Sequence, residues 1–255
     1  MLTDYTREIR ALTACGAFLL LQSAAAQAAS TDTPAAIVIV AHAIAQNGAF
    51  TAGSDPRAAL WARVPEEEIE LKLAPPVHPA IALNQAAVKT ARALPLHVSA
   101  LTDHRRLYLR LRWKDRTHDD RRATGLFPDA AAVEVPIAAT DTAVMMGTPD
   151  KPVAIWRWDA AKNEVEALAA GSPGTLTPAV DDGLRGSGSY RELGDAASNE
   201  WCVVIARDLE ERGEARLDLR ARKRFPAAFA IWQGSDGQRG GFKHVSDWVS
   251  VRLPD

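Results

Sequence analysis

The clearest alternation of apolar and polar residues lies between positions 106 and 114. The odd positions from Leu107 to Trp113 are apolar, whereas the even positions from Arg106 to Lys114 carry arginines, a tyrosine and a lysine. A period of two predicts a half-buried strand with a basic outer face. We interpret that face as a solvated strand surface, with a docking surface for a partner protein as the alternative.

Five shorter apolar runs between chain breakers predict further strands. In one of them, Val153 and Ile155 are expected on one face of the strand and Trp156 and Trp158 on the other. Helical patterning is weak and amounts to a turn or two at 84–92 and at 206–212. The pattern therefore predicts an all-β fold with few short helices, an antiparallel β-sandwich or an open barrel. The five runs are residues 133–137, 153–158, 201–206, 225–232 and 248–253.

Glycines, prolines and acidic residues mark the expected loops. Residues 171–188 hold five glycines and two prolines and predict a long loop. The acidic run Glu66–Glu68 predicts a solvated turn. Residues 234–246 hold four glycines between two apolar runs and predict a β-hairpin loop that carries Lys243 near its end. Either this loop is flexible and its lysine solvated, or Lys243 points at a group held against the sheet.

The N-terminus predicts export. Two arginines precede an apolar run over residues 11–21, and small residues follow. This order is typical of a secretory signal peptide, here residues 1–28, with cleavage after Ala26 or Ala28. An uncleaved N-terminal helix is the alternative. The mature chain, residues 29–255, fits a single domain of β-sandwich size.

Composition narrows the classes of function. A net charge of −2 argues against a nucleic-acid partner, and no run reaches the roughly 18 apolar residues of a membrane span. Cys202 is the only cysteine after the predicted signal peptide, which excludes an internal disulfide and a cysteine metal cluster. The pairs Asp119–Asp120 and Asp181–Asp182 are expected to be solvated, with calcium binding at the second pair as the alternative. No motif indicates a catalytic centre.

Two adjacent methionines stand out in a chain that holds three. Met145 and Met146 precede Gly147 in a segment rich in turn-forming residues. A thioether is a soft ligand that haem proteins use on iron. The alternative is that one or both methionines fill a gap in the core.

Three segments, taken in their order and spacing, carry a family resemblance. They are residues 127–136, Met146–Gly147 followed by residues 152–158, and residues 229–246. Together they resemble the haem b-binding gamma subunits of periplasmic molybdenum enzymes, the ethylbenzene dehydrogenase-like group of the type II dimethyl sulfoxide reductase family. The resemblance runs from about residue 60 to the C-terminus.

That resemblance implies an antiparallel β-sandwich with a haem pocket between loops at one side. It implies one b haem with Met146 and Lys243 as the axial ligands of the iron, and Met145 and His244 as less favoured alternatives. Neighbouring side chains in an extended segment point to opposite faces, so Lys243 and His244 are not both expected to face the iron. Because both axial positions would be filled, the implied role is one-electron transfer without catalysis at the haem.

The same resemblance implies an iron–sulfur beta subunit and an alpha subunit with the molybdenum cofactor as partners, and a soluble periplasmic cytochrome as redox partner. Two rival hypotheses stay open. One is a non-catalytic β-sandwich module without haem that binds a ligand such as carbohydrate through exposed tryptophans. The other is a relative that keeps the fold and has lost the haem.

Overall fold

The structure is a computed structural model that describes residues 37–45, 54–87, 93–138, 141–210 and 217–255. Strands dominate these residues, so the all-β prediction is confirmed. The predicted signal peptide, residues 1–28, lies outside them. In chain order the elements are β1 (Val38–Ala43), η1 (Ala59–Arg63), β2 (Glu67–Leu73), α2 (Pro79–Ala87), β3 (Ala93–Thr102), β4 (Arg106–Lys114), β5 (Ala130–Pro136), β6 (Val153–Asp159), β7 (Glu164–Ala170), β8 (Thr177–Pro178), β9 (Leu184–Arg191), η2 (Ala196–Ser198), β10 (Glu200–Asp208), β11 (Arg224–Trp232), η3 (Gly234–Asp236), β12 (His244–Val245) and β13 (Val249–Arg252).

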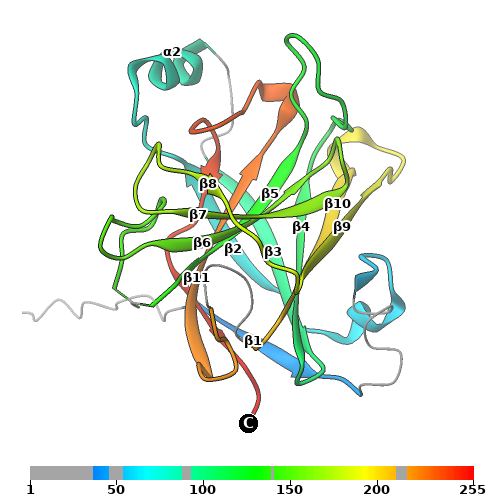
Figure 1. Ribbon diagram of the computed structural model, residues 1–255. Coiled ribbons are helices and arrows are strands. Elements are labelled where there is room, and N and C mark those ends of the chain that lie inside the picture. Colours follow the sequence, from blue (N-terminus) through cyan, green and yellow to red (C-terminus); the bar gives the residue numbers. More distant parts are fainter. Residues whose placement is uncertain (1–36, 46–53, 88–92, 139–140, 211–216) are drawn as a thin grey trace, which may run out of the picture. The chain divides into compact units, whose positions relative to one another are not determined.

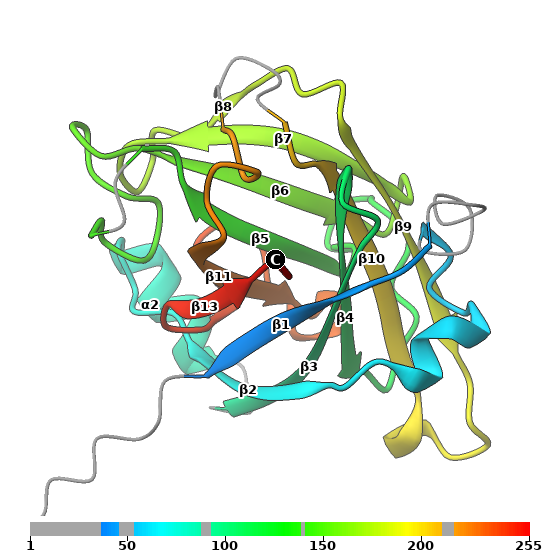
Figure 2. The ribbon, with the colours of Figure 1, turned by 90° about the horizontal axis from the view of Figure 1, so that it is seen from below.

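The strands follow one path in the order β8-β7-β6-β5-β11-β12-β2-β3-β4-β10-β9, and neighbours along this path are antiparallel (Figure 1). Seen from below, they surround a common core (Figure 2). The predicted antiparallel sandwich is therefore confirmed. β1 is the exception, because Val38–Val40 pair in parallel with β13 and Ala41–Ala43 in parallel with β3.

Two glycines of β9 explain why a segment predicted as a loop is a strand. A Cβ atom on Gly188 would lie 2.2 Å from Cζ2 of Trp158 in β6, and one on Gly186 would lie 2.4 Å from Cγ2 of Val165 in β7. The glycines thus allow β9 to pack closely on β6 and β7 while it pairs with β10. The loop prediction for residues 171–188 is wrong from Leu184 onward.

The core consists of a large inner apolar cluster and two smaller ones, of which one lies on the strands β5, β6, β7 and β11. Trp156 and Trp158 belong to the inner cluster, where Trp158 contacts Trp201 at 4.9 Å between ring centroids. Val153 and Ile155 belong to a smaller cluster on the other face of the same strands. The predicted division of faces in residues 153–158 is confirmed. Met146 packs against this smaller cluster.

The basic face of β4 is covered rather than solvated. Tyr108 is 0% exposed, and Arg110 lies over the ring of Trp61 at 5.0 Å from its centroid. Arg110 and Arg112 donate to opposite oxygens of Glu66 at 2.7 and 2.5 Å. The interpretation of the β4 face as a solvated or docking surface is therefore wrong, because Arg110 and Arg112 form ion pairs with Glu66 of the same chain. The acidic run Glu66–Glu68 is not a solvated turn either, since Glu67 and Glu68 begin β2.

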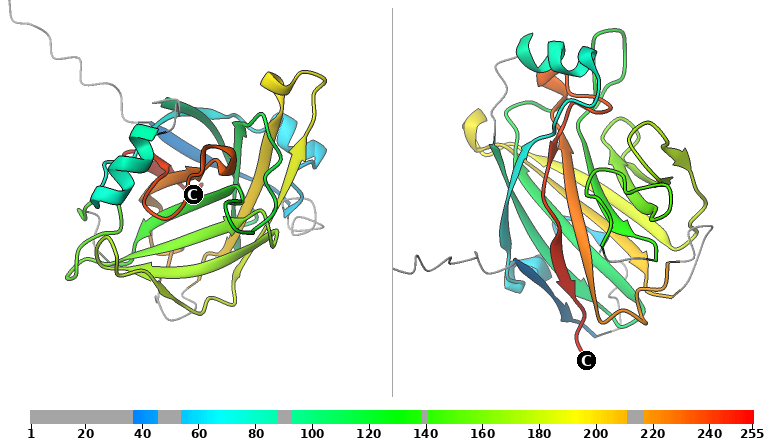
Figure 3. Two further views of the ribbon diagram at one scale, coloured as in Figure 1. Left: turned by 90° about the horizontal axis from the view of Figure 1, so that it is seen from above. Right: turned by 90° about the vertical axis from the view of Figure 1, so that its left-hand side faces the viewer.

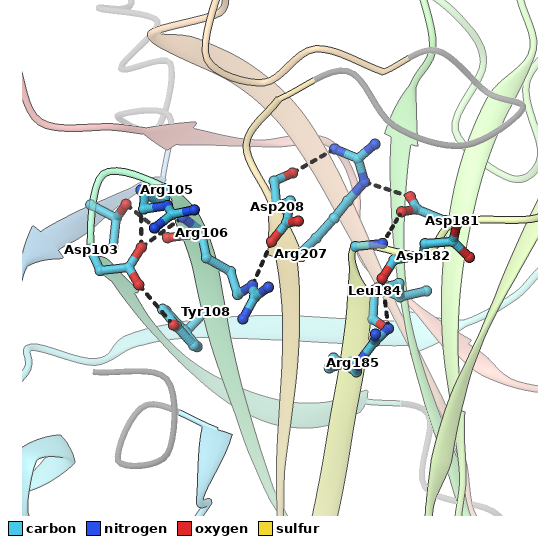
Figure 4. Close-up of polar contacts among 12 residues, drawn as sticks. Asp103, Arg105, Arg106, Tyr108, Asp181, Asp182, Leu184, Arg185, Arg207 and Asp208 are labelled. Atoms are coloured by element: carbon cyan, nitrogen blue, oxygen red, sulfur yellow. Dashed lines mark hydrogen bonds and ion pairs between the residues drawn. The ribbon is translucent and has the colours of Figure 1, made fainter. Parts of the chain in front are cut away.

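Asp181 is also buried where a solvated pair was expected. The Nε atom of Arg207 donates to its carboxylate at 2.7 Å, and the two side chains are 1% and 7% exposed, arginine first (Figure 4). Only Asp182 is exposed, as predicted. A paired arginine at this place supplies the positive charge that a calcium ion would otherwise provide.

Helical structure is sparse, as expected, but lies elsewhere. α2 covers Pro79–Ala87 and overlaps the predicted turn at 84–92 only in part. Residues 206–208, predicted as helical, form the end of β10, where pairing with β4 decides the conformation. Among the described helices, none is long and apolar enough to cross a membrane.

Candidate functional site

The two methionines sit in a turn with an unusual backbone. Met145, Met146 and Gly147 have φ angles of +74°, +79° and +63°, so three successive residues are left-handed. Each non-glycine residue in this region costs of order 1–3 kcal/mol and persists only where its surroundings impose it. Glycine is required at the third place, because a Cβ atom on Gly147 would lie 2.6 Å from the carbonyl oxygen of Lys151.

Glu134 in β5 fixes this turn to the sheet. The backbone N–H of Met146 donates to both carboxylate oxygens of Glu134, at 3.1 Å each. A second clamp is the hydroxyl of Thr142, which donates to the carbonyl of Lys151 at 2.7 Å. These bonds hold the left-handed turn over the outer face of β5 and β6, next to the smaller apolar cluster.

Lys243 reaches the same place from the β11–β12 hairpin. Its carbonyl accepts from the N–H of Ala74, and its Nζ lies 4.9 Å from the ring centroid of Trp232. The hairpin turns through two left-handed glycines, Gly237 and Gly240. It is an ordered segment that includes η3 and β12, with its lysine partly buried, so the interpretation as a flexible loop with a solvated lysine is wrong.

Helix α2 packs against the tip of this hairpin. A Cβ atom on Gly241 would lie 2.5 Å from Cδ1 of Ile81 in α2. Figure 3 shows α2 beside the hairpin segment at one end of the strands. Close contact between helix and hairpin therefore depends on a glycine at this position.

A cavity of about 30 Å³ separates the lysine from the methionine turn. That volume is room for about one water molecule. Small side chains from β5 and β11 form part of its floor, which leaves the sheet surface flat at this point. The lining includes Ala132, Glu134, Met145, Ala230, Trp232 and Lys243.

The surroundings of the cavity disfavour the charged forms of Lys243 and Glu134. Burial lowers the pKa of the Lys243 amine, while the charge of Glu134 raises it and that of Arg157 lowers it. Burial raises the pKa of Glu134 to about 7, against the effect of the Met146 amide and the Lys243 charge. An amine whose neutral form is favoured is a potential electron-pair donor to a metal.

His244 lies on the opposite face from Lys243. Its ring is 0% exposed, and its Nδ1 atom is 3.2 Å from Nε2 of Gln238. Lys243 and Val245 line the cavity, whereas His244 does not. The expectation that the two neighbours face different sides is confirmed for the cavity.

Both methionines are at the site, in different positions. Met145 lines the cavity together with Lys243. Met146 packs against the smaller apolar cluster, which includes Ile155 and Trp232. Both side chains are partly buried. The turn thus presents two sulfur atoms to one region of the sheet.

Comparison with known proteins identifies the family. Residues 58–191 match the family described as ethylbenzene dehydrogenase. The chain belongs to this family. Among curated relatives, the gamma subunit of dimethylsulfide dehydrogenase from Rhodovulum sulfidophilum is 38% identical over 205 residues, which cover 79% of this chain and 76% of the relative. The gamma subunit of chlorate reductase from Ideonella dechloratans is 36% identical over 208 residues, covering 79% and 82%.

A third curated relative is named as a heme subunit. A protein of Haloferax mediterranei, ORF7, whose name describes a respiratory nitrate reductase heme subunit, is 34% identical over 196 residues, covering 76% of this chain and 66% of the relative. Among solved structures, a family 9 carbohydrate-binding module from Caldicellulosiruptor kristjanssonii in complex with glucose has a TM-score of 0.43 and 9% identity, covering 85% of this chain and 95% of the module. Likeness at that level carries no information on the ligand.

The ethylbenzene dehydrogenase match includes the methionine turn and ends before Lys243. The sequence patterns did not indicate Glu134 as part of the site. The sequence nevertheless holds a signal for Glu134. Glu134 follows Ala132 by two residues and therefore lies on the same face of β5. A charged residue on a face of small apolar residues is unusual. Trp232 is buried in the smaller apolar cluster and also lines the cavity.

Glu134→Ala is expected to loosen the methionine turn. Hydrogen bonds to a charged group contribute about 1.5–3 kcal/mol, so hydrogen exchange at the Met146 amide should accelerate by roughly 10- to 100-fold. Glu134→Gln keeps one acceptor oxygen and is expected to preserve most of the protection. Unchanged exchange at Met146 in the alanine variant would show that the turn is held by other contacts.

Proposed function

We propose that this chain is an electron-transfer subunit that binds one b haem between Met146 and Lys243 as axial ligands. The observation that carries the proposal is the pairing of a partly buried lysine, whose pKa burial lowers, with a left-handed methionine turn across one cavity. Lysine and methionine come from segments almost a hundred residues apart in the sequence.

The donor set fits a haem. A neutral amine and a thioether are both lone-pair donors suited to iron in a porphyrin. The alanines on β5 and β11 leave a flat floor, and Trp232 adds an aromatic wall. The cavity of about 30 Å³ is much smaller than a porphyrin. Binding therefore requires the cavity to open by movement of its walls.

A haem held in this way supplies one-electron oxidation and reduction. The chain's own groups position it and control its surroundings. Burial disfavours the charged amine of Lys243, so loss of its proton costs less than in water. Glu134 holds the Met146 amide and thereby the position of the sulfur. With two protein ligands on the iron, no coordination position remains for a substrate, which restricts the site to electron transfer.

The relatives' names support a place in a multi-subunit enzyme. Two relatives are gamma subunits of a dehydrogenase and of a reductase, and a third is named as a heme subunit. We infer that this chain joins an iron–sulfur beta subunit and an alpha subunit with the molybdenum cofactor. It would relay electrons between the iron–sulfur clusters and a soluble periplasmic cytochrome. The signal peptide expected at residues 1–28 supports a periplasmic location.

The carbohydrate-module hypothesis required exposed tryptophans. All seven tryptophans lie in the described residues, and none is exposed. Trp201 contributes to the wall of a cavity of about 520 Å³ but is 3% exposed itself. A flat sugar-binding platform of the usual aromatic kind is therefore absent from the described surface.

The visible spectrum of the exported full-length chain tests the proposal. Purified from haem-supplied cells, the protein should show a reduced low-spin b-type spectrum with one haem per chain, extractable by acid acetone. Absence of haem from such protein would overturn the proposal and leave the haem-free relative. A haem that resists acid acetone would exclude the b type.

A further inference from the structure

Three aspartates from separate positions in the chain meet beside the hairpin. Asp115 follows β4 directly, Asp119 lies in the next loop, and Asp129 directly precedes β5. One carboxylate oxygen from each lies within 4.8 Å of the other two. Asp115 is 3% and Asp129 is 0% exposed. Asp119 is half-buried, so the expectation that the Asp119–Asp120 pair is solvated holds only for Asp120.

One oxygen in the cluster has no partner. Oδ2 of Asp115 is buried and accepts no hydrogen bond. Its other oxygen accepts from the N–H and the hydroxyl of Thr117 at 3.1 and 3.2 Å. The same hydroxyl lies 2.6 Å from Oδ2 of Asp119, and its single proton can serve only one of the two carboxylates. A buried carboxylate oxygen left unpaired is costly and calls for a missing partner.

Asp129, by contrast, has hydrogen-bond donors on both oxygens, and its Oδ1 keeps a free acceptor position. Its Oδ1 accepts from the N–H of Gly234 at 2.8 Å, and its Oδ2 accepts from Nε1 of Trp201 at 2.8 Å and from the N–H of Asp119 at 3.0 Å. These donors are neutral, and all of them stabilise an ionised carboxylate.

The cluster also has no cation of its own. In the described residues, no lysine, arginine or histidine forms an ion pair with Asp115, Asp119 or Asp129. On the same loop, Arg121 pairs with Asp120 and Arg122 with Asp159. Burial raises the pKa of Asp129 to about 8 and of Asp115 to about 6, and the charge of each neighbouring aspartate adds to the rise. Either bound protons or a bound cation must compensate the charge.

We propose that Asp115, Asp119 and Asp129 hold one calcium ion. Calcium prefers oxygen ligands at 2.3–2.6 Å, so two ligands on opposite sides of the ion lie about 4.8 Å apart. Three carboxylates whose oxygens lie no farther apart than this, one of them with an unused buried oxygen, fit such an ion, and water can complete its shell. Magnesium demands near-ideal octahedral geometry and keeps several waters, which fits a half-buried, irregular cluster less well.

A cation here would connect the β4–β5 loop to the hairpin that carries Lys243. Gly234 at the start of η3 donates to Asp129 and is packed so closely that a Cβ atom would lie 1.9 Å from the carbonyl oxygen of Phe127. The same added atom would lie 2.9 Å from Cβ of Asp119. The proposed ion therefore has a structural role at the base of the hairpin, separate from the methionine turn.

Calcium titration of the full-length exported protein tests the proposal, after treatment with EGTA. Isothermal titration with CaCl2 should give one site per chain. At calcium about 100-fold above the dissociation constant, the melting temperature should rise by roughly 5–10 °C. Magnesium chloride at equal concentration should give a smaller rise. No heat and no change in melting temperature up to about 10 mM CaCl2, the weak end for extracellular calcium modules, would overturn the proposal in favour of shared protons.

Variants locate the site. Asp115→Asn should weaken calcium binding at least tenfold, and in EGTA it should melt a few degrees above the natural chain, because it removes one buried negative charge. Asp120→Asn, on the same loop but exposed, is the matched control and should bind calcium normally. If Asp115→Asn does not fold, Asp119→Asn at the half-buried position gives the same test. Equal calcium affinity in the Asp115 or Asp119 variant, or an equal response to magnesium, would contradict a calcium site here.

Discussion

Lys243→Ala and Met146→Ala are each expected to abolish the low-spin haem spectrum. Lys243 is the only lysine that lines the cavity in the described residues, so its loss leaves one face of the iron to water or to no ligand. The result should be a high-spin spectrum or haem-free protein. Haem retention should fall by at least roughly tenfold, which corresponds to 1.4 kcal/mol or more of binding free energy. Absorbance spectra and haem extraction on equal amounts of folded protein measure both effects.

Two matched variants control this experiment. Lys72→Ala removes an exposed lysine from β2, the strand that pairs with β12, and should leave the spectrum unchanged. Met145→Ala decides between the two sulfur atoms. Met145 lines the cavity, whereas the N–H of Met146 is held by Glu134. If Met145→Ala alone destroys the low-spin spectrum, Met145 is the ligand and the assignment to Met146 is wrong.

The strands that could be predicted from the sequence are those with a clear apolar or alternating pattern of their own. β4, β6, β10 and β11 carry long apolar or alternating runs of branched and aromatic residues. β9 could not be predicted, because its sequence Leu-Arg-Gly-Ser-Gly-Ser-Tyr-Arg has a low strand propensity and forms a strand through contacts with Trp158 and Val165. The parallel pairing of β1 is also a tertiary effect.

The same distinction applies to the site. Lys243 and the methionine turn could be named from the family resemblance, but only the folded chain brings them to one cavity. The positive φ angles at Met145 and Met146 could not be predicted, since neither residue favours this conformation. The basic face of β4 was misinterpreted because Glu66, which neutralises Arg110 and Arg112, is more than forty residues away in the sequence. The aspartate cluster could not be predicted either, because only the folded path of the chain between β4 and β5 brings the three carboxylates together.

In calcium-free buffer, the melting temperature is expected to fall as pH rises from about 5 to about 9. Asp115 and Asp129 have folded pKa values of about 6 and 8, above the ordinary value of 3.8. A carboxyl group whose pKa is raised by folding stabilises the folded state while protonated, and this contribution is lost as pH rises through the folded pKa. Glu134, with a pKa of about 7, acts in the same direction. The combined fall should be at least about 5 °C.

Saturating calcium should remove the share of this fall that belongs to the aspartates. Protons and the cation compete for the same carboxylates, so the difference in melting temperature between calcium and EGTA should widen as pH rises. Glu134→Gln should reduce the fall in both buffers and leave that difference unchanged. His118→Gln is a further control variant close to the aspartates. His118 stacks on Tyr190, and the Tyr190 hydroxyl donates to the backbone carbonyl of Asp115. Equal falls in calcium and EGTA would assign the pH dependence to Glu134 and count against a cation at the aspartates.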